Sequence, residues 1–455
     1  KPTWGLLTSL KCQGSNDGST WTTLYENTNT GDTGSSLLQF SLGGGATPTP
    51  TSSSVVTPTP TITPVATPTN TPTPPVGNTR IGTNFWFTYG DGCIPFRADA
   101  TFAVGSNPWK QEFLDELAPY MLLRCMEWQS TNNNDTANWA DRKQQTDPNQ
   151  HAPWLDGDYY WVEGSLWLPK DDPPTHIGDG IACEWLIDLA NRLDKDLWVC
   201  IPHKATDDYS LQMALLFKNT LEPGRKLYIE YSNEAWNTIF DVEHYCEEHG
   251  LALGLDTNQW AAAHKYYAVR ALQHLTIWEN VFTGADRDRL VLVLAGQDGN
   301  DYLARVHLNI MNDPVWNPSG VVPDAYAVSP YIGHGMDGAD PNILTLLNNE
   351  IPNTVANNQN VKEELAPYGM RFITYEGGQH VTTNADVLYR NPGIYNFYIN
   401  YLNQMNGLFD LMALYCHVKG PVDSSNAFGH KEFIGESSAT AHKYRAIMDW
   451  INAHP

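Results

Sequence analysis

From residue 80 onward, short runs of β-branched, aromatic and aliphatic residues alternate with longer segments whose apolar positions recur at helical spacing. The short runs are almost continuously apolar, as expected of parallel strands buried on both faces. They predict eight strands, over residues 80–87, 120–128, 195–203, 226–234, 289–297, 324–332, 370–376 and 411–418. The helical segments cover residues 182–194, 210–221, 259–282, 301–311 and 392–405.

Strands that alternate with helices predict an α/β chain, and eight strands predict a (β/α)8 TIM barrel over residues 79–455. A doubly wound open sheet is the alternative. Such a sheet usually has a Gly-rich first turn that binds a nucleotide, and the first run, "RIGTNFWF", lacks one. The barrel is therefore the favoured interpretation. Its active site is expected at the carboxyl ends of the strands.

The chain before the barrel has a different composition. Residues 46–78 are dominated by Thr and Pro, which predicts an extended spacer without a core. Residues 1–45 include "LKCQGSNDGSTWTTLYENTN", which resembles the middle of a discoidin-type (F5/8 type C) β-sandwich. The resemblance implies a truncated carbohydrate-binding module, because a piece this short buries too little surface to be stable alone.

Composition narrows the class of ligand. The 455 residues carry a formal net charge of −24 without a basic run, which argues against nucleic acid as a partner. No apolar stretch is long enough to span a bilayer. The seven cysteines show no metal-ligand spacing, so we expect buried thiols and neither a metal nor a cofactor. The 16 Trp and 22 Tyr residues fit carbohydrate binding, and the linker is typical of secreted polysaccharide-degrading enzymes. We expect a secreted, extracellular monomer.

Polar and aromatic residues gather where the predicted strands end. In chain order these residues are Asn84, Trp86, Arg124, Trp128, His203, Asn233, Glu234, Gln297, Tyr331, His334, Glu376 and His417. Glu234 and Glu376 follow the fourth and seventh strands. Two such carboxyls are what glycoside hydrolysis requires, because one donates a proton to the leaving oxygen while the other attacks the anomeric carbon.

Two motifs carry a resemblance to a known group of enzymes. "YSNEAWN" places Asn233 and Glu234 at the end of the fourth strand, and "FITYEGG" places Glu376 at the end of the seventh. With eight strands, this arrangement resembles the retaining glycoside hydrolases of the (β/α)8-barrel clan that contains the family 5 cellulases and mannanases (clan A). The resemblance covers roughly residues 80–450. The chain departs from family 5 at Ala235, where a proline is usual.

The resemblance implies roles for the residues at these positions. Glu234 would be the acid/base and Glu376 the nucleophile, while Asn233 would hydrogen-bond the 2-hydroxyl of the sugar. Tyr331 would donate a hydrogen bond to Glu376, and Arg124 would stabilise the ionised carboxylate by its charge.

The remaining candidates are assigned to substrate binding or support. The resemblance places His203 on the donor-side floor of the site. Trp86, Trp128 and Trp236 are candidates for stacking on sugars, and Gln297, His334 and His417 are supporting candidates at strand ends. Glu230 has the same strand parity as Glu234, so we expect it to be a structural partner of a buried cation such as Arg124. Residues 129–180 form a long loop, and its tryptophans are Trp139, Trp154, Trp161 and Trp167.

Two classes of function follow. The first is a retaining endo-glycosidase that cleaves a β-linked plant polysaccharide, with β-1,4-glucan as the first substrate and mannan or xylan as alternatives. The second is a non-catalytic carbohydrate-binding barrel. A retaining transglycosylase would use the same residues as the first class and differ in the acceptor it prefers. A variant that lacks the Glu376 carboxylate separates catalysis from binding.

Overall fold

The computed structural model describes residues 79–86, 92–147, 150 and 180–455, together with four strands whose backbones alone are described. The chain divides into two units, residues 1–69 and 70–455. In the first unit, β1 (Leu10–Gly14) and β2 (Thr22–Asn27) form an antiparallel pair. The predicted spacer over 46–78 lies outside the described residues, and the discoidin-like module stays a prediction.

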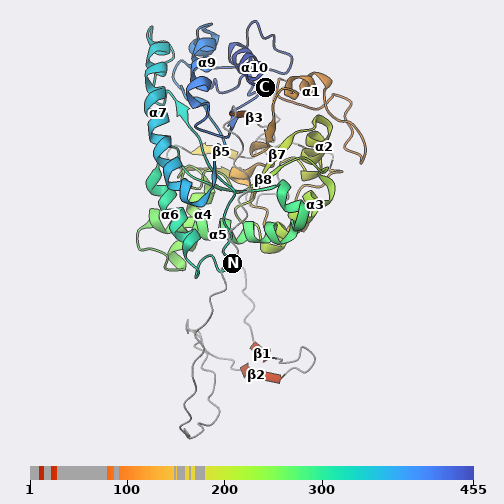
Figure 1. Ribbon diagram of the computed structural model, residues 1–455. Coiled ribbons are helices and arrows are strands. Elements are labelled where there is room, and N and C mark those ends of the chain that lie inside the picture. Colours follow the sequence, from red (N-terminus) through yellow and green to blue (C-terminus); the bar gives the residue numbers. More distant parts are fainter. Residues whose placement is uncertain are drawn as a thin grey trace. The chain divides into compact units, whose positions relative to one another are not determined.

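The second unit contains a closed barrel of eight parallel strands (Figure 1). The strands are β3 (Arg80–Asn84), β4 (Leu122–Arg124), β7 (Asp196–Ile201), β8 (Leu227–Tyr231), β9 (Leu290–Ala295), β10 (Ala325–Val328), β12 (Arg371–Thr374) and β14 (Leu411–Leu414). Each pairs in parallel with the next one around the ring, and β14 closes on β3. Every strand lies inside a predicted run, so the (β/α)8 prediction is confirmed.

Helices follow the strands and form the outer layer (Figure 1). They are α1 (Gln111–Leu117), α2 (Cys183–Leu193), α3 (Asp207–Thr220), α4 (Asp241–Ala252), α5 (Gln259–Val281), α6 (Asp301–Asn312), α7 (Ile343–Leu365), α8 (Ala385–Arg390), α9 (Ile394–Met405) and α10 (His442–Ala453). The five predicted helices correspond to α2, α3, α5, α6 and α9. Among the described residues, no helix is long and apolar enough to cross a membrane.

Short elements occur along the chain between the barrel strands and the helices. Two minor sheets pair β11 (Tyr331–Ile332) with β13 (Gly378–Gln379) and β5 (Tyr159–Val162) with β6 (Ser165–Pro169). The 3-10 turns are η1 (Glu127–Gln129), η2 (Thr131–Asn133), η3 (Trp139–Asp141), η5 (Gly284–Arg289) and η6 (Ala366–Tyr368). The β11–β13 pair continues β10 and β12 past the barrel rim. Its backbone pairing therefore fixes the position of the chain around Glu376.

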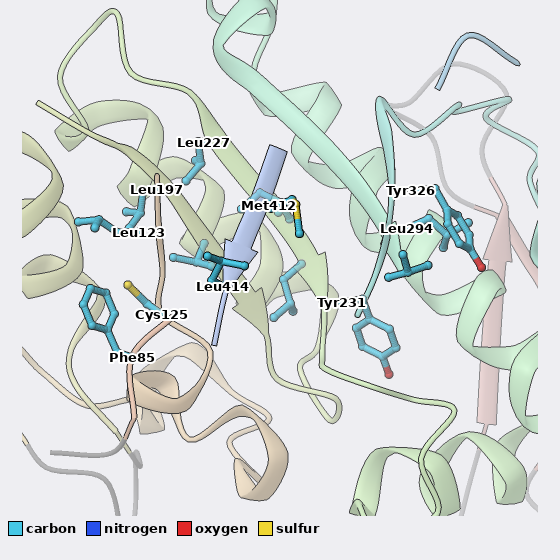
Figure 2. Packing of buried hydrophobic residues seen from close by; sticks show 14 of the residues in the cluster. Phe85, Leu123, Cys125, Leu197, Leu227, Tyr231, Leu294, Tyr326, Met412 and Leu414 are labelled. Carbon is cyan, nitrogen blue, oxygen red and sulfur yellow. The ribbon is translucent and has the colours of Figure 1, made fainter. Parts of the chain in front are cut away.

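The core has two layers that alternate along each strand. Leu197, Leu227 and Leu414 belong to the layer between strands and helices, part of which Figure 2 shows. Their neighbours Trp198 and Tyr228 belong to a second cluster that fills the barrel interior. Because side chains alternate between the two faces of a strand, every second residue points inward. The barrel is thus a packed core rather than a pore.

Six cysteines within the described residues are buried and free, and three of them, Cys125, Cys200 and Cys416, lie in the apolar strand-like runs of the sequence. Burial raises the pKa of the Cys93 and Cys183 thiols to about 12, because the apolar surroundings disfavour the thiolate. These thiols pack as small apolar side chains.

Candidate active site

Arg124 connects several strand ends at the carboxyl end of the barrel. It is the inward-facing last residue of β4, and its side chain is fully buried. Its Nη1 donates to Asn84 Oδ1 at 3.0 Å and to Glu376 Oε1 at 3.2 Å. Its Nη2 donates to Glu230 Oε2 and to Asn233 Oδ1, both at 2.8 Å. One guanidinium therefore orients four side chains from three other parts of the ring.

Glu230 is a structural partner of Arg124. It is fully buried on β8, and its Oε2 also accepts from Trp198 Nε1 at 2.9 Å. Burial raises the pKa of Glu230, while the positive charge of Arg124 opposes that shift. A buried carboxylate beside a buried cation is stabilised when both are hydrogen-bonded. The contacts match the expectation from strand parity.

Glu376 has one strong donor on each carboxylate oxygen. Tyr331 Oη donates to Oε2 at 2.8 Å, and Arg124 Nη1 donates to Oε1. The parallel pairing of Tyr331 with Gly378 holds the tyrosine beside the end of β12. Burial raises the pKa of Glu376, and Arg124 and Tyr331 both act against that rise. Because both partners favour the charged form, they equip this carboxylate to act as a nucleophile.

Glu234 is in a different environment just past β8. Asn237 Nδ2 donates to its Oε2 at 2.9 Å, and Tyr375 Oη approaches its Oε1 at 3.4 Å. Trp236 Nε1 donates to the same tyrosine oxygen at 3.0 Å. Burial, and then the negative charge of Glu376, raise the pKa of Glu234 to about 8. Glu234 therefore holds a proton at neutral pH, as a general acid must.

The backbone that presents Glu234 is strained. Ser232 and Glu234 have φ angles of +56° and +42°, in the left-handed region that non-glycine residues rarely adopt. Such conformations cost about 1–3 kcal/mol each and concentrate at functional sites. Between them, Asn233 is fixed by Arg124 on its oxygen and by Asn132 Oδ1, which accepts from its Nδ2 at 3.0 Å.

The structure brings together six of the sequence-predicted residues at one end of the barrel. These residues are Arg124, Asn233, Glu234, Tyr331, Trp236 and Glu376. They come from the ends of β4, β8 and β12 and from β11, so their proximity depends on closure of the ring. Trp86 follows β3 at the same end, and the centroid of its ring lies 3.7 Å from Lys419 Nζ.

Trp128 does not line a subsite, which corrects the prediction for this residue. Its side chain is 2% exposed and stacks on Phe85, with ring centroids 4.1 Å apart. Trp109 and Phe113 pack against it as well. The 3-10 turn η1 directs the tryptophan beneath the loop and into the layer between strands and helices, where no sugar reaches it.

His417 also lies apart from the carboxyl pair. Its Nε2 is 3.0 Å from Glu116 Oε2 on α1, and its ring packs against Phe113 and Tyr444 of the outer helices. Strand β14 ends three residues earlier, at Leu414, so the regular alternation of strand side chains no longer applies at this position. His417 joins the barrel to α1 and α10.

Three further candidates have local partners of their own. Gln297 Oε1 accepts from Asn300 Nδ2 at 3.0 Å, in the turn that leads into α6. His334 Nδ1 lies 3.1 Å from the Nδ1 of His380, whose ring in turn contacts Tyr331. His203 is fully buried against Tyr245, and burial lowers its pKa to about 4. His203 is therefore neutral at ordinary pH.

Sequence reasoning missed a third carboxyl and two residues near it. Glu127 is 5% exposed and accepts from Tyr415 Oη at 3.1 Å. Burial and the charge of Glu376 raise the pKa of Glu127 to about 8, while Lys419 lowers it. Glu127 directly precedes Trp128 in "CMEW". Selecting polar and aromatic residues at strand ends identified Trp128 as a candidate but did not identify Glu127.

The long second loop contains one described tryptophan with a clear environment. Trp139 packs edge-on against Tyr209 of α3, and Arg142 lies 4.1 Å from the tryptophan ring centroid. The backbones of Trp161 and Trp167 face each other in the β5–β6 pair. Trp154 lies outside the described residues. A small cavity in this region, bordered by Tyr209, is separate from the carboxyl pair.

Within the described residues, one group of three side chains is close enough to share a metal ion. Glu243, His244 and Glu247 on α4 have ligand atoms within 4.8 Å of one another. His244 and Glu247 are exposed or half-buried, and acidic surface groups are common without a metal. Within this group, His244 Nδ1 lies 3.3 Å from Glu243 Oε2.

Comparison with known proteins adds likenesses of fold. No protein-family model matches the chain, and no curated protein matches it. An α-L-arabinofuranosidase from Thermotoga maritima is 14% identical, with 83% of this chain and 71% of that chain covered and a TM-score of 0.47. A Bacteroidetes-affiliated GH5 cellulase is 13% identical, with coverages of 83% and 92% and a TM-score of 0.41. A family 5 xyloglucanase from Paenibacillus pabuli is 11% identical, with coverages of 83% and 99% and a TM-score of 0.44. These values are too low to carry an argument about activity or substrate.

Proposed function

We propose that this protein is a retaining glycoside hydrolase in which Glu376 is the nucleophile and Glu234 is the general acid/base. The observation that carries the proposal is the contrast between the two carboxyls. Arg124 and Tyr331 favour the ionised form of Glu376, whereas burial and the charge of Glu376 keep a proton on Glu234. Two carboxyls in opposite protonation states are what double displacement needs.

In the first step, a Glu376 carboxylate oxygen attacks the anomeric carbon and the glycosidic C–O bond breaks. Glu234 gives its proton to the departing oxygen, which leaves as an alcohol. The result is a glycosyl ester on Glu376 and an ionised Glu234. Asn233 lies next to the acid and is held by Arg124, so it is positioned to hydrogen-bond the sugar 2-hydroxyl.

In the second step, Glu234 accepts a proton from water as the water oxygen attacks the anomeric carbon. The ester bond to Glu376 breaks, and both carboxyls return to their initial states. Because the anomeric carbon is inverted twice, its configuration is retained. At the end of the cycle Glu376 is fully ionised again, and Tyr331 and Arg124 stabilise its negative charge.

We further propose a β-linked plant polysaccharide as the substrate, with β-1,4-glucan first and mannan or xylan as alternatives. Trp86 and Trp236 follow strand ends at the carboxyl end of the barrel and remain partly exposed, and they suit stacking on sugar rings. An extracellular location fits the Thr/Pro-rich segment that precedes the barrel.

The test is release of reducing sugar from carboxymethyl cellulose, barley β-glucan, glucomannan, galactomannan and xylan. Wild type is compared with Glu376→Gln and Glu234→Gln. Each change removes a charge or a proton that the reaction uses, so we expect activity to fall by at least about a thousandfold. Proton NMR of the first product formed should show the β-anomer when the bond cleaved is β.

Glu243→Gln is the matched control, since Glu243 is a buried glutamate on α4 without contact to the pair. It should retain wild-type activity. If the wild type binds one of the polymers and releases no sugar, the chain is a binding barrel instead. If Glu376→Gln remains fully active, the assignment of the nucleophile is wrong.

A further inference from the structure

Two exposed aromatic side chains stack on each other away from the carboxyl pair. Trp260 is 36% exposed and Tyr302 is 57% exposed. Their rings are inclined by 19°, with centroids 5.8 Å apart. In the described part of the chain, the other strongly exposed aromatic side chain is Phe433, which is 48% exposed. Exposed aromatic pairs are uncommon on protein surfaces and often mark contact sites.

Both rings are held in position from the protein side. The imidazole of His264, which is 1% exposed, packs edge-on against Trp260 with centroids 4.2 Å apart. Arg305 lies 5.9 Å from the Tyr302 ring centroid and is fixed by ion pairs to Asp301 and Glu364. Side chains ordered before binding lose little conformational freedom when a ligand arrives, which favours affinity.

Topology places this pair at the same end of the barrel as the carboxyls. Tyr302 is the second residue of α6, which begins six residues after the last residue of β9. Helices that follow parallel strands begin at the carboxyl ends of those strands, where Glu234 and Glu376 also lie. Trp260 is the second residue of α5 and is brought to this rim by its contact with Tyr302.

We propose that Trp260 and Tyr302 form a second carbohydrate-binding surface, which holds a β-linked polysaccharide chain outside the active site. This inference rests on the proposed function and adds to it a place where the polymer is anchored. Sugar rings present C–H faces that pack on aromatic rings, with hydroxyl groups at their edges. Asn258 and Asn300 cap the two helices through their side-chain oxygens, which accept from Ala261 N–H and Leu303 N–H, so stacking on the two rings is the contact that would hold the polymer.

The experiment is native electrophoresis of the full-length chain through gels that contain barley β-glucan, carboxymethyl cellulose, glucomannan or xylan. Retardation gives the Kd for each polymer. We expect the Trp260→Ala/Tyr302→Ala variant to bind the retarding polymer about tenfold more weakly than wild type. The variant that keeps both rings, Trp260→Phe/Tyr302→Phe, should restore most of the affinity. Phe433→Ala controls for the loss of an exposed aromatic side chain elsewhere.

Turnover of a short chromogenic β-glycoside by the same proteins separates this inference from the proposed function. The double alanine variant should turn over this substrate at the wild-type rate, because a short substrate does not reach the outer surface. A wild type that is retarded but inactive would refute the catalytic assignment and leave the binding comparison intact. The second surface is refuted if retardation is the same in wild type and the double alanine variant. It is also refuted if no polymer retards the wild type, or if the variant loses a dimer instead of polymer affinity.

Discussion

At the scale of single residues, Glu234 and Glu376 show how surroundings give one side chain two chemical roles. Both are glutamates that follow a buried strand, and the pKa of each is raised by burial. Glu376 alone has a guanidinium and a phenol directed at its two oxygens. Glu234 has the amide of Asn237 and a long contact to Tyr375. The positions of a few donors therefore separate the nucleophile from the acid.

Tyr331→Phe tests the donor on the nucleophile. The hydrogen bond from Tyr331 lowers the pKa of Glu376, so its removal raises that pKa and protonates more of the carboxylate in mild acid. We expect the acid limb of the kcat/KM profile to move to higher pH, with a loss of about tenfold on that limb. Glu234 sets the alkaline limb, near its pKa of about 8.

Tyr401→Phe is the control, because its buried hydroxyl donates to the Pro330 carbonyl at 2.8 Å and does not contact either carboxyl. Its pH profile should match that of the wild type. An acid limb that stays in place in Tyr331→Phe would mean that Arg124 alone sets the ionisation of Glu376.

Arg124→Met tests the buried charge network by its effect on stability. The change leaves Glu230 and Glu376 buried without their cation, so the free energy of unfolding should fall by about 3–5 kcal/mol. Urea denaturation at pH 7 measures it. Adding Glu230→Gln to Arg124→Met should recover part of the loss.

Arg390→Met provides the comparison for a surface ion pair. Arg390 is 59% exposed and pairs with Glu432, and its loss should cost less than about 1 kcal/mol. If the two arginine variants lose the same free energy of unfolding, the buried carboxylates do not depend on Arg124 for their stability.

At the scale of elements, the α5–α6 region concentrates buried histidines. His264 and His274 on α5 and His307 on α6 are each at most 1% exposed. Burial lowers the pKa of all three, to about 4 for His264, because the apolar surroundings disfavour the imidazolium. Protonation of these histidines is therefore expected to destabilise the folded barrel in acid.

The sign of the effect follows from proton binding. Between pH 6.5 and about 4, the unfolded chain protonates His264 while the folded chain does not, so stability falls as the pH falls. The difference between these two pKa values corresponds to about 3 kcal/mol. We expect the wild type to lose more free energy of unfolding than His264→Gln between pH 7 and pH 4.5, as measured by urea denaturation.

His244→Gln is the matched control, since His244 is half exposed on α4. Its pH dependence should equal that of the wild type. If His264→Gln shows the full wild-type loss as well, protonation of His264 does not contribute to the acid sensitivity.

At the scale of the whole molecule, closure of the ring is the event that assembles the site. Strand β14 pairs with β3, which joins residues more than 300 positions apart in the chain. Thr79 fixes the start of the ring, because its Oγ1 donates to the Phe409 carbonyl at 2.6 Å and its N–H donates to Asn406. The barrel unit thus has a defined beginning just before β3.

A shortened chain tests whether the barrel is self-sufficient. Residues 70–455 form a unit of their own, so this chain should keep the thermal midpoint of the barrel transition and the turnover of a small substrate. Calorimetry and the chromogenic assay measure both. A chain that begins at residue 85 lacks β3 and should fail to fold, because it leaves β14 and β4 without their shared neighbour. If the two shortened chains show the same thermal midpoint and the same turnover, the barrel does not need β3.

Secondary structure was predictable where the chain carries a local signal. All eight barrel strands fall inside apolar runs, because parallel strands covered on both faces need apolar residues at almost every position. Helix α7 escaped prediction because it is rich in asparagine and contains Pro352, which is unfavourable in a helix interior. Packing of its buried face, including Leu347 and Ile351, outweighs those preferences.

The sequence by itself determined the eight-strand order and which residues stand at the strand ends, since both depend on hydrophobic periodicity along the chain. Tertiary structure alone decided what those residues do. Trp128 and Trp236 both follow a strand end, yet one is enclosed by Phe85 and Trp109 while the other reaches Tyr375 beside Glu234. Burial, hydrogen-bond partners and pKa depend on segments brought together by ring closure, and no local pattern records those neighbours.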